Sequence, residues 1–296
     1  MIATNNFKKL LYFLLVISTA IACSSIKEID NDWARDRNIC KKLTGDILVY
    51  TIFVSNKKYL PWDENEMNTY IDSIKVATAW MEFQAKENNI PLNIRTVKHK
   101  KASLKGAPGK SNESAMKLLH SLTGLTKVNK HYDGISKKMK NSVVKQKTAL
   151  KPLVKKIKGK QNFAAMLRNQ YQCESVVLLF AHKKDKGGHI AFSLNTLNNT
   201  DIEYLVTSFN EPSMISYQIL EMFGAASLRH ANNPRKKNKI AEHVKTYFKD
   251  DIMANPMASR INNTNIGSFT QYLIGWKNEY NPKHKILMKG KRVRVK

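Results

Sequence analysis

Three residues in the second half of the chain have a spacing that suits a metal site. Tyr217, Glu221 and Gly224 follow each other at i, i+4 and i+7, so a helix would place them on one face. Two side chains one turn apart on a helix can bind the same zinc ion if both are good ligands. Glu221 offers a carboxylate, whereas tyrosine is a poor zinc ligand near neutral pH. The segment therefore has the spacing of a zinc site but only one suitable ligand.

The residues around this trio predict a helix over 212–224. Pro212 suits a first helical turn, Ser208 or Asn210 is a candidate cap, and Gly224 suits the end. An apolar stripe at helical spacing forms a second face, which is expected to be buried; it consists of Ile215, Ile219, Met222 and Phe223.

This pattern resembles the active-site helix of metzincin-like zinc metallopeptidases, whose signature is H-E-x-x-H-x-x-G-x-x-H/D. In that signature the histidines bind zinc, the glutamate activates the bound water and the glycine turns the chain toward the third ligand. Aligning Gly224 with the family glycine puts Tyr217 and Glu221 at the histidines, Gln218 at the general base and Ser227 at the third ligand. An amide cannot serve as a general base. The resemblance thus implies a family scaffold with no catalytic residues and no bound zinc.

A second block of sequence supports the resemblance. Asp251-Ile252-Met253, followed by residues 266–276, resembles the methionine turn and closing helix of secreted bacterial members of this group. Gly224 and Met253 would then be structural motif residues of a domain at 46–282. The alternative is that 212–224 is simply a core helix.

Length and composition indicate a folded, strongly basic protein. The 296 residues are 42% hydrophobic, which is enough for a sizeable core. Lys and Arg number 50 against 23 acids, a net charge of +27. Such a chain attracts anions, for example acidic lipid headgroups, anionic glycans, nucleic acid or acidic proteins.

The N-terminus predicts export. Residues 1–22 have the features of a signal peptide: Lys8 and Lys9, a short apolar run, and small residues before Cys23. Small residues leading into a cysteine resemble a bacterial lipobox, in which Cys23 would carry acyl chains such as palmitate. Ordinary signal cleavage and an uncleaved anchor are the alternatives. Export to the cell envelope argues against nucleic acid as a partner.

Two further cysteines are left if Cys23 is acylated. Cys40 and Cys173 are then a candidate disulfide in an exported protein, and two unpaired thiols are the alternative.

The body of the chain predicts an α/β fold with a twisted mixed sheet of four or five strands and packing helices. Residues 23–45 suit a tether, and β-rich apolar runs indicate strands at 45–54, 89–97, 175–181 and 189–194. Helices are expected near 65–88, 161–171, 212–224 and 267–278. Strand 45–54, helix 65–88 and strand 89–97 form a βαβ unit, which implies parallel pairing. In the resembled family an edge strand near the cleft holds extended substrate, and residues 189–194 are the candidate for it.

Two segments carry much of the basic character. Residues 98–160 are rich in Lys, with Glu113 and Asp133 as the acids, and the tail 283–296 is basic throughout. The insertion either contacts anionic surfaces or is a solvated loop. The tail is predicted to be a frayed end or an anion-binding strip.

Several histidines are candidate substitute zinc ligands; they are His182, His189, His230 and His243, the last beside Glu242. None has a partner at metal spacing on a predicted helix. Three functions remain open: a pseudopeptidase that binds a peptide or protein, an envelope lipoprotein that contacts anionic lipid or glycan, and a zinc hydrolase with unusual ligands.

Overall fold

The computed structural model describes residues 42–55, 62–99, 104–105, 132–137, 159–184, 188–194, 203–228, 237–257 and 260–288. All of them belong to one compact unit, residues 34–296. The predicted signal peptide, the lipidation residue Cys23, Trp33 and Cys40 lie outside the described residues.

A mixed β-sheet forms the centre of the unit, with the strand order β2-β1-β4-β6-β5. The four strands from β2 to β6 in that order are parallel to one another. The edge strand β5 pairs antiparallel with β6. A two-residue strand, β3, continues the pairing along β1 beyond β2. The strands are β1 (Gly45–Ser55), β2 (Leu92–Lys98), β3 (Leu104–Lys105), β4 (Ser175–His182), β5 (Ala191–Leu194) and β6 (Tyr204–Thr207). The prediction of a mixed sheet with packing helices is confirmed.

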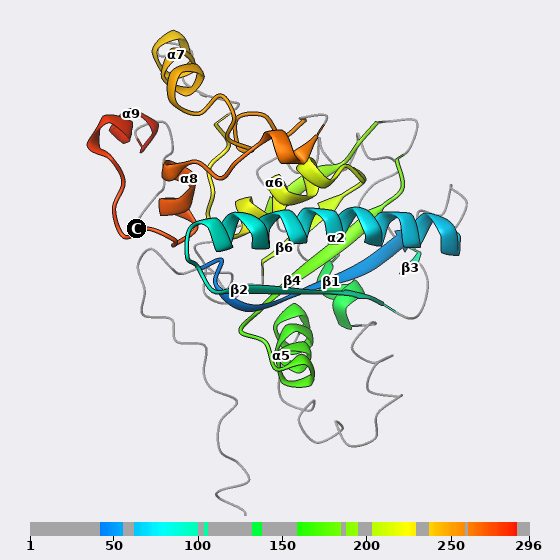
Figure 1. The fold of residues 1–296 in the computed structure, drawn as a ribbon. Coiled ribbons are helices and arrows are strands. Elements are labelled where there is room, and N and C mark those ends of the chain that lie inside the picture. Colours follow the sequence, from blue (N-terminus) through cyan, green and yellow to red (C-terminus); the bar gives the residue numbers. More distant parts are fainter. Residues whose placement is uncertain are drawn as a thin grey trace, which may run out of the picture. The chain divides into compact units, whose positions relative to one another are not determined.

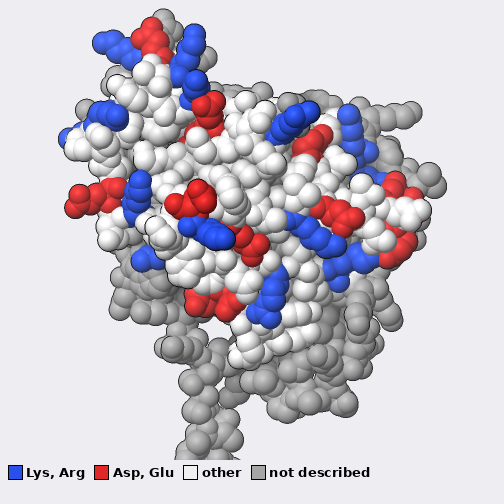
Figure 2. All heavy atoms as spheres, in the orientation of Figure 1, with Lys and Arg blue, Asp and Glu red and all other residues white. Residues whose placement is uncertain are grey.

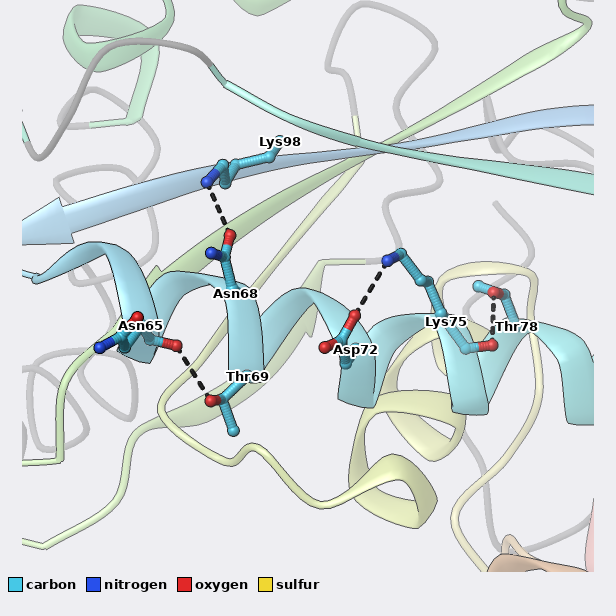
Figure 3. Close-up of polar contacts among 7 residues, drawn as sticks. All are labelled: Asn65, Asn68, Thr69, Asp72, Lys75, Thr78 and Lys98. Carbon is cyan, nitrogen blue, oxygen red and sulfur yellow. Dashed lines mark hydrogen bonds and ion pairs between the residues drawn. The ribbon is translucent and has the colours of Figure 1, made fainter.

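The predicted βαβ unit is present. Helix α2 (Glu64–Glu87) connects β1 to β2, and the two strands pair in parallel. Asp63 starts the helix with a capping box: its side chain accepts from the Glu66 backbone N–H at 2.8 Å, and the Glu66 side chain accepts from the Asp63 N–H at 2.9 Å. Such a cap stabilises a helix by about 1 kcal/mol. Further contacts of α2, including the Asn68 to Lys98 bond at 2.9 Å that ties it to β2, are drawn in Figure 3.

Two apolar layers cover the two faces of the sheet (Figure 1). Alternate residues of β1 point to opposite sides: Ile47 and Val49 join a cluster with α2 and α6 (Pro212–Met222), whereas Leu48 and Tyr50 join a cluster with α5 (Gly159–Tyr171). All eight residues of β4 are buried, as expected for a central parallel strand.

One central strand, β6, was not predicted from the sequence. Strand β6 has only four residues, all buried, and lies between β4 and β5. The strands at 175–182 and 191–194 therefore do not pair with each other. Instead β5 pairs with β6 and is the edge strand of the sheet, the position expected for residues 189–194.

Part of the basic insertion belongs to the core. Residues 132–137 form a helical turn, and the Tyr132 side chain is fully buried against Phe180 and Tyr204. Of the rest of the insertion, the structure describes only residues 98–99, 104–105 and 159–160.

The C-terminal part is irregular and contains short helices. They are α7 (Lys237–Tyr247), the 3₁₀ turn η3 (Ile261–Asn263), α8 (Ser268–Leu273), η4 (Pro282–His284) and α9 (Lys285–Met288). The closing helix is thus shorter than the predicted 267–278. The expectation of a frayed tail from residue 283 is wrong for residues 283–288, because His284 is buried among aromatic rings.

The folded body begins a few residues earlier than expected. Leu43, placed in the predicted tether, is fully buried, and its backbone N–H donates to Ile274 O at 3.1 Å. The Trp276 indole N–H donates to Leu43 O at 2.6 Å. These contacts fasten the start of β1 to the C-terminal part. No helix among the described residues is long and apolar enough to cross a membrane.

Candidate functional site

Helix α6 has the two faces predicted from its sequence. Its apolar side is buried against α2 and the sheet, and Ser216 Oγ donates to Ala77 O of α2 at 3.3 Å. Pro212 is in the first turn, but the N-cap residue is Glu211, which makes no side-chain capping bond. Neither Ser208 nor Asn210 is the cap. The helix ends at Met222, and Gly224 takes φ +99°, a conformation that glycine adopts without strain.

Tyr217 and Glu221 meet on the more exposed face of α6. Both side chains are half-buried, and the Tyr217 hydroxyl donates to Glu221 Oε1 at 2.8 Å. Gly224 follows the end of the helix and is also half-buried. The predicted proximity of Tyr217 and Glu221 on one face is confirmed. Their mutual bond uses the only carboxylate of the trio.

Gln218 points away from that pair. Its side chain is only 1% exposed, and Nε2 donates to the Val206 carbonyl of β6 at 3.3 Å. The Gln218 Oε1 atom is buried without a hydrogen-bond partner. A buried amide held against the sheet has neither the basicity nor the position to activate water at the exposed face.

Ser227 follows the turn at Gly224 and is half-buried, and its hydroxyl has no hydrogen-bond partner among the described residues. One residue later, the Leu228 N–H donates to Met253 O at 2.9 Å. This bond joins the segment that follows α6 to the turn at Met253, whose side chain is fully buried. The two sequence blocks that carry the family resemblance are therefore in direct contact.

Asp251 organises the Met253 turn. Asp251 is only 1% exposed, and its carboxylate accepts three hydrogen bonds, from Met253 N at 2.8 Å, Gly267 N at 3.1 Å and Thr270 Oγ1 at 2.8 Å. Burial raises its pKa to about 6, and the three hydrogen bonds partly oppose that rise. The sequence identified this residue as part of a motif but gave no sign that its side chain would connect two elements.

The edge strand β5 lies beside α6. Ser193 Oγ donates to the backbone carbonyl of Gln218 at 2.8 Å, a contact between residues that sequence reasoning did not connect. Ser208 N donates to Ile190 O at 2.8 Å, and pairing alternates along an antiparallel ladder. The N–H and C=O groups of Ala191 and Ser193 therefore point away from β6. No strand of the described residues pairs with that outer side.

The four candidate histidines are not together. His182 is buried with its Nε2 at 3.0 Å from the Tyr132 hydroxyl. His189 stacks on Phe209 and has Nδ1 at 3.3 Å from Ser208 Oγ. Both line a cavity of about 600 Å³ near the start of α2. His230 lies outside the described residues.

His243 has a partner that the sequence did not indicate. Its Nε2 lies 2.9 Å from His284 Nδ1. Burial, with lesser contributions from His243 and Lys283, lowers the pKa of His284 to about 4, and burial together with Lys283 lowers that of His243. The pair has no third ligand: within the described ranges, no group of three or more His, Cys, Asp or Glu side chains could hold a metal ion.

Cys173 is a free, half-buried thiol whose pKa is raised by burial. Its candidate partner, Cys40, lies outside the described residues, so the disulfide stays a prediction.

Comparisons of the chain with family models, with curated proteins and with solved structures found no match.

Proposed function

We propose that this protein is an exported, lipid-anchored pseudopeptidase that binds an extended peptide or protein segment beside helix α6 without cleaving it. The observation that carries the proposal is the adjacency of β5 and α6. An edge strand with outward backbone groups lies next to the helix that carries Tyr217 and Glu221, the residues that the family resemblance aligns with zinc ligands.

The backbone chemistry of β5 suits a peptide partner. An extended segment can add to a sheet edge by pairing with outward N–H and C=O groups, here those of Ala191 and Ser193. Half-buried Tyr217 would offer a ring and a hydroxyl to side chains of that segment, and polar and aromatic groups of this kind are typical of binding surfaces. Helix α6, fixed by its buried face and by the Met253 turn, supplies a rigid base for the interaction.

The same residues explain why the bound segment would stay intact. Peptide hydrolysis on such a site needs a metal to polarise the carbonyl and a base to activate water. Glu221 is the only good zinc ligand of the aligned positions, and Gln218 provides no base. We propose that Tyr217 and Glu221 keep the helix face ordered through their mutual bond.

Binding at the edge can be tested with Ala191→Pro. Proline removes the outward N–H at that position and leaves the pairing with β6 in place. We expect the variant to lose affinity for peptides selected from a random library of extended peptides about ten residues long. Ala191→Val, which keeps the N–H, is the matched control and should retain affinity. Equal binding by both variants would refute β5 as the binding edge.

A second function is supported by the distribution of charge. On the face drawn in Figure 2, acidic and basic side chains of the described residues are interspersed. Along the sequence, most of the net charge of +27 falls in segments outside the described residues, chiefly the insertion and the tail. We propose as the alternative that these segments hold anionic lipid or glycan. Salt-sensitive co-sedimentation with anionic vesicles, lost when Lys residues of 106–131 become Gln, would support it. Binding that persists in high salt would contradict it.

A further inference from the structure

Helix α2 carries an exposed stripe with the spacing of a helix-pairing surface. Asp72, Val76, Ala79, Phe83 and Lys86 are separated by four, three, four and three residues, and all five are exposed. Val76 is 50% exposed and Phe83 is 56% exposed. Alternating spacings of three and four keep side chains on one seam of two packed helices. A single exposed apolar residue is ordinary. Here Val76, Ala79 and Phe83 follow one another along one side of a 24-residue helix and form a continuous apolar surface.

The charges at the two ends of the stripe have opposite signs and lie at equal distances from its centre. Asp72 and Lys86 are each seven residues from Ala79, one on either side. If a second copy of the helix lies antiparallel with Ala79 opposite Ala79, each Asp72 meets Lys86 of the second copy. A parallel arrangement would place like charges opposite each other. The stripe thus has the two-fold self-complementarity that a symmetric dimer requires.

The surroundings of the stripe leave room for this pairing. Figure 1 shows α2 packed beside α6 against one face of the sheet, with the side opposite the sheet turned outward. Figure 2, drawn in the same orientation, shows charged side chains of both signs over the place where α2 lies. A shallow hollow of about 650 Å³ lies beside Phe83 and is bordered also by Lys86 and Ile90. In the antiparallel pair this hollow faces the turn that contains Val76 of the second copy.

Asp72 is available for such a contact. Among the residues that the structure describes, it pairs only with Lys75, at 2.9 Å, and both side chains are more than half exposed (Figure 3). An exposed i, i+3 pair of this kind stabilises a helix by only a few tenths of a kcal/mol, so Asp72 can turn to Lys86 of the second copy at little cost.

From the spacing and the charge symmetry we infer that the chain forms an antiparallel homodimer through α2, centred on Ala79. The ends carry two symmetric Asp72 to Lys86 ion pairs, and the centre buries Val76, Ala79 and Phe83. Because one helix face buries a small area, the dissociation constant should be on the order of micromolar.

Charge reversal tests the arrangement. Sedimentation of the full chain in a non-ionic detergent should show a concentration-dependent dimer. Asp72→Lys places two lysines opposite each other at each end, and Lys86→Asp places two aspartates there. We expect each variant alone to dimerise about tenfold more weakly, because two attractive contacts become repulsive. An equimolar mixture of the two variants restores both attractive contacts and should dimerise about as well as the unmodified chain.

The controls separate the interface from general effects of charge and detergent. Asp250→Lys makes the same charge change at an exposed site outside α2 and should leave dimerisation unchanged. Ala79→Cys should form an intermolecular disulfide on addition of copper phenanthroline, whereas Asp250→Cys should not. An unmodified chain that stays monomeric at about 1 mM, or a mixture of variants no better than its components, would overturn the inference.

Discussion

The carboxylate of Asp251 joins the Met253 turn to helix α8, so replacing it should weaken both. Asp251→Asn keeps the size of the side chain but provides one acceptor oxygen instead of two. Met253 N donates to one carboxylate oxygen and Gly267 N to the other, so one of these N–H groups must face the amide NH₂. Each buried polar group left without a partner costs about 1–3 kcal/mol. We expect the free energy of unfolding to fall by about 2–4 kcal/mol.

The pH dependence gives this prediction its second test. Because the folded-state pKa of Asp251 is raised from 3.8 to about 6, the folded chain holds more protons than the unfolded chain between these values. The contribution of Asp251 to stability is therefore largest at low pH and declines as the pH rises toward 6 and above. From pH 5 to pH 7 the decline amounts to about 1 kcal/mol. Asn does not titrate, so the substitution should destabilise the protein about 1 kcal/mol more at pH 5 than at pH 7.

Urea unfolding followed by tryptophan fluorescence at pH 5, 6 and 7 measures this difference directly. The comparison of two variants at each pH cancels the titration of all other groups. Asp250→Asn, at the exposed neighbouring position, is the control and should change stability by less than about 0.5 kcal/mol. A destabilisation by Asp251→Asn that is independent of pH, or greater at pH 7, would refute the assigned direction of the pKa shift.

Two further substitutions test other parts of the site region. Gly224→Ala should destabilise the protein by about 1 kcal/mol because φ +99° is strained for alanine. Gly134→Ala is the control and should not destabilise it, because an added Cβ there meets nothing within 4 Å. Equal effects of the two substitutions in thermal unfolding would count against the strained turn at Gly224. His284, whose folded-state pKa of about 4 lies below the ordinary 6.5, binds fewer protons when folded. Stability should therefore decline as the pH falls from about 6.5 to 4, and His284→Phe should reduce that decline; an unchanged pH profile would contradict the role assigned to His284.

Local patterns were sufficient to predict most of the regular elements. The Asp63 to Glu66 cap, the apolar stripes of α2 and α6 and the buried run of β4 are each determined by residues close in sequence. The two faces of α6 follow from its 3.6-residue period, so the grouping of Tyr217, Glu221 and Gly224 could be predicted without coordinates.

What sequence reasoning missed depends on contacts between distant residues. The four residues of β6 are too short a run to distinguish from a loop, and their central place comes from pairing with β4 and β5. Similarly, His243 meets His284 across 41 residues, and Leu43 is buried by Ile274 and Trp276. The direction of Gln218, toward Val206 and not toward the exposed face, depends on how α6 sits on the sheet.

The zinc content of the purified protein tests the central claim most directly. After dialysis against zinc and removal of free metal, the unmodified chain should retain no zinc. The variant Tyr217→His/Glu221→His/Ser227→His should retain about one zinc ion per chain, because it places three histidines at the positions that the family resemblance assigns to zinc ligands. Stoichiometric zinc in the unmodified chain, or a folded variant that binds none, would contradict the account.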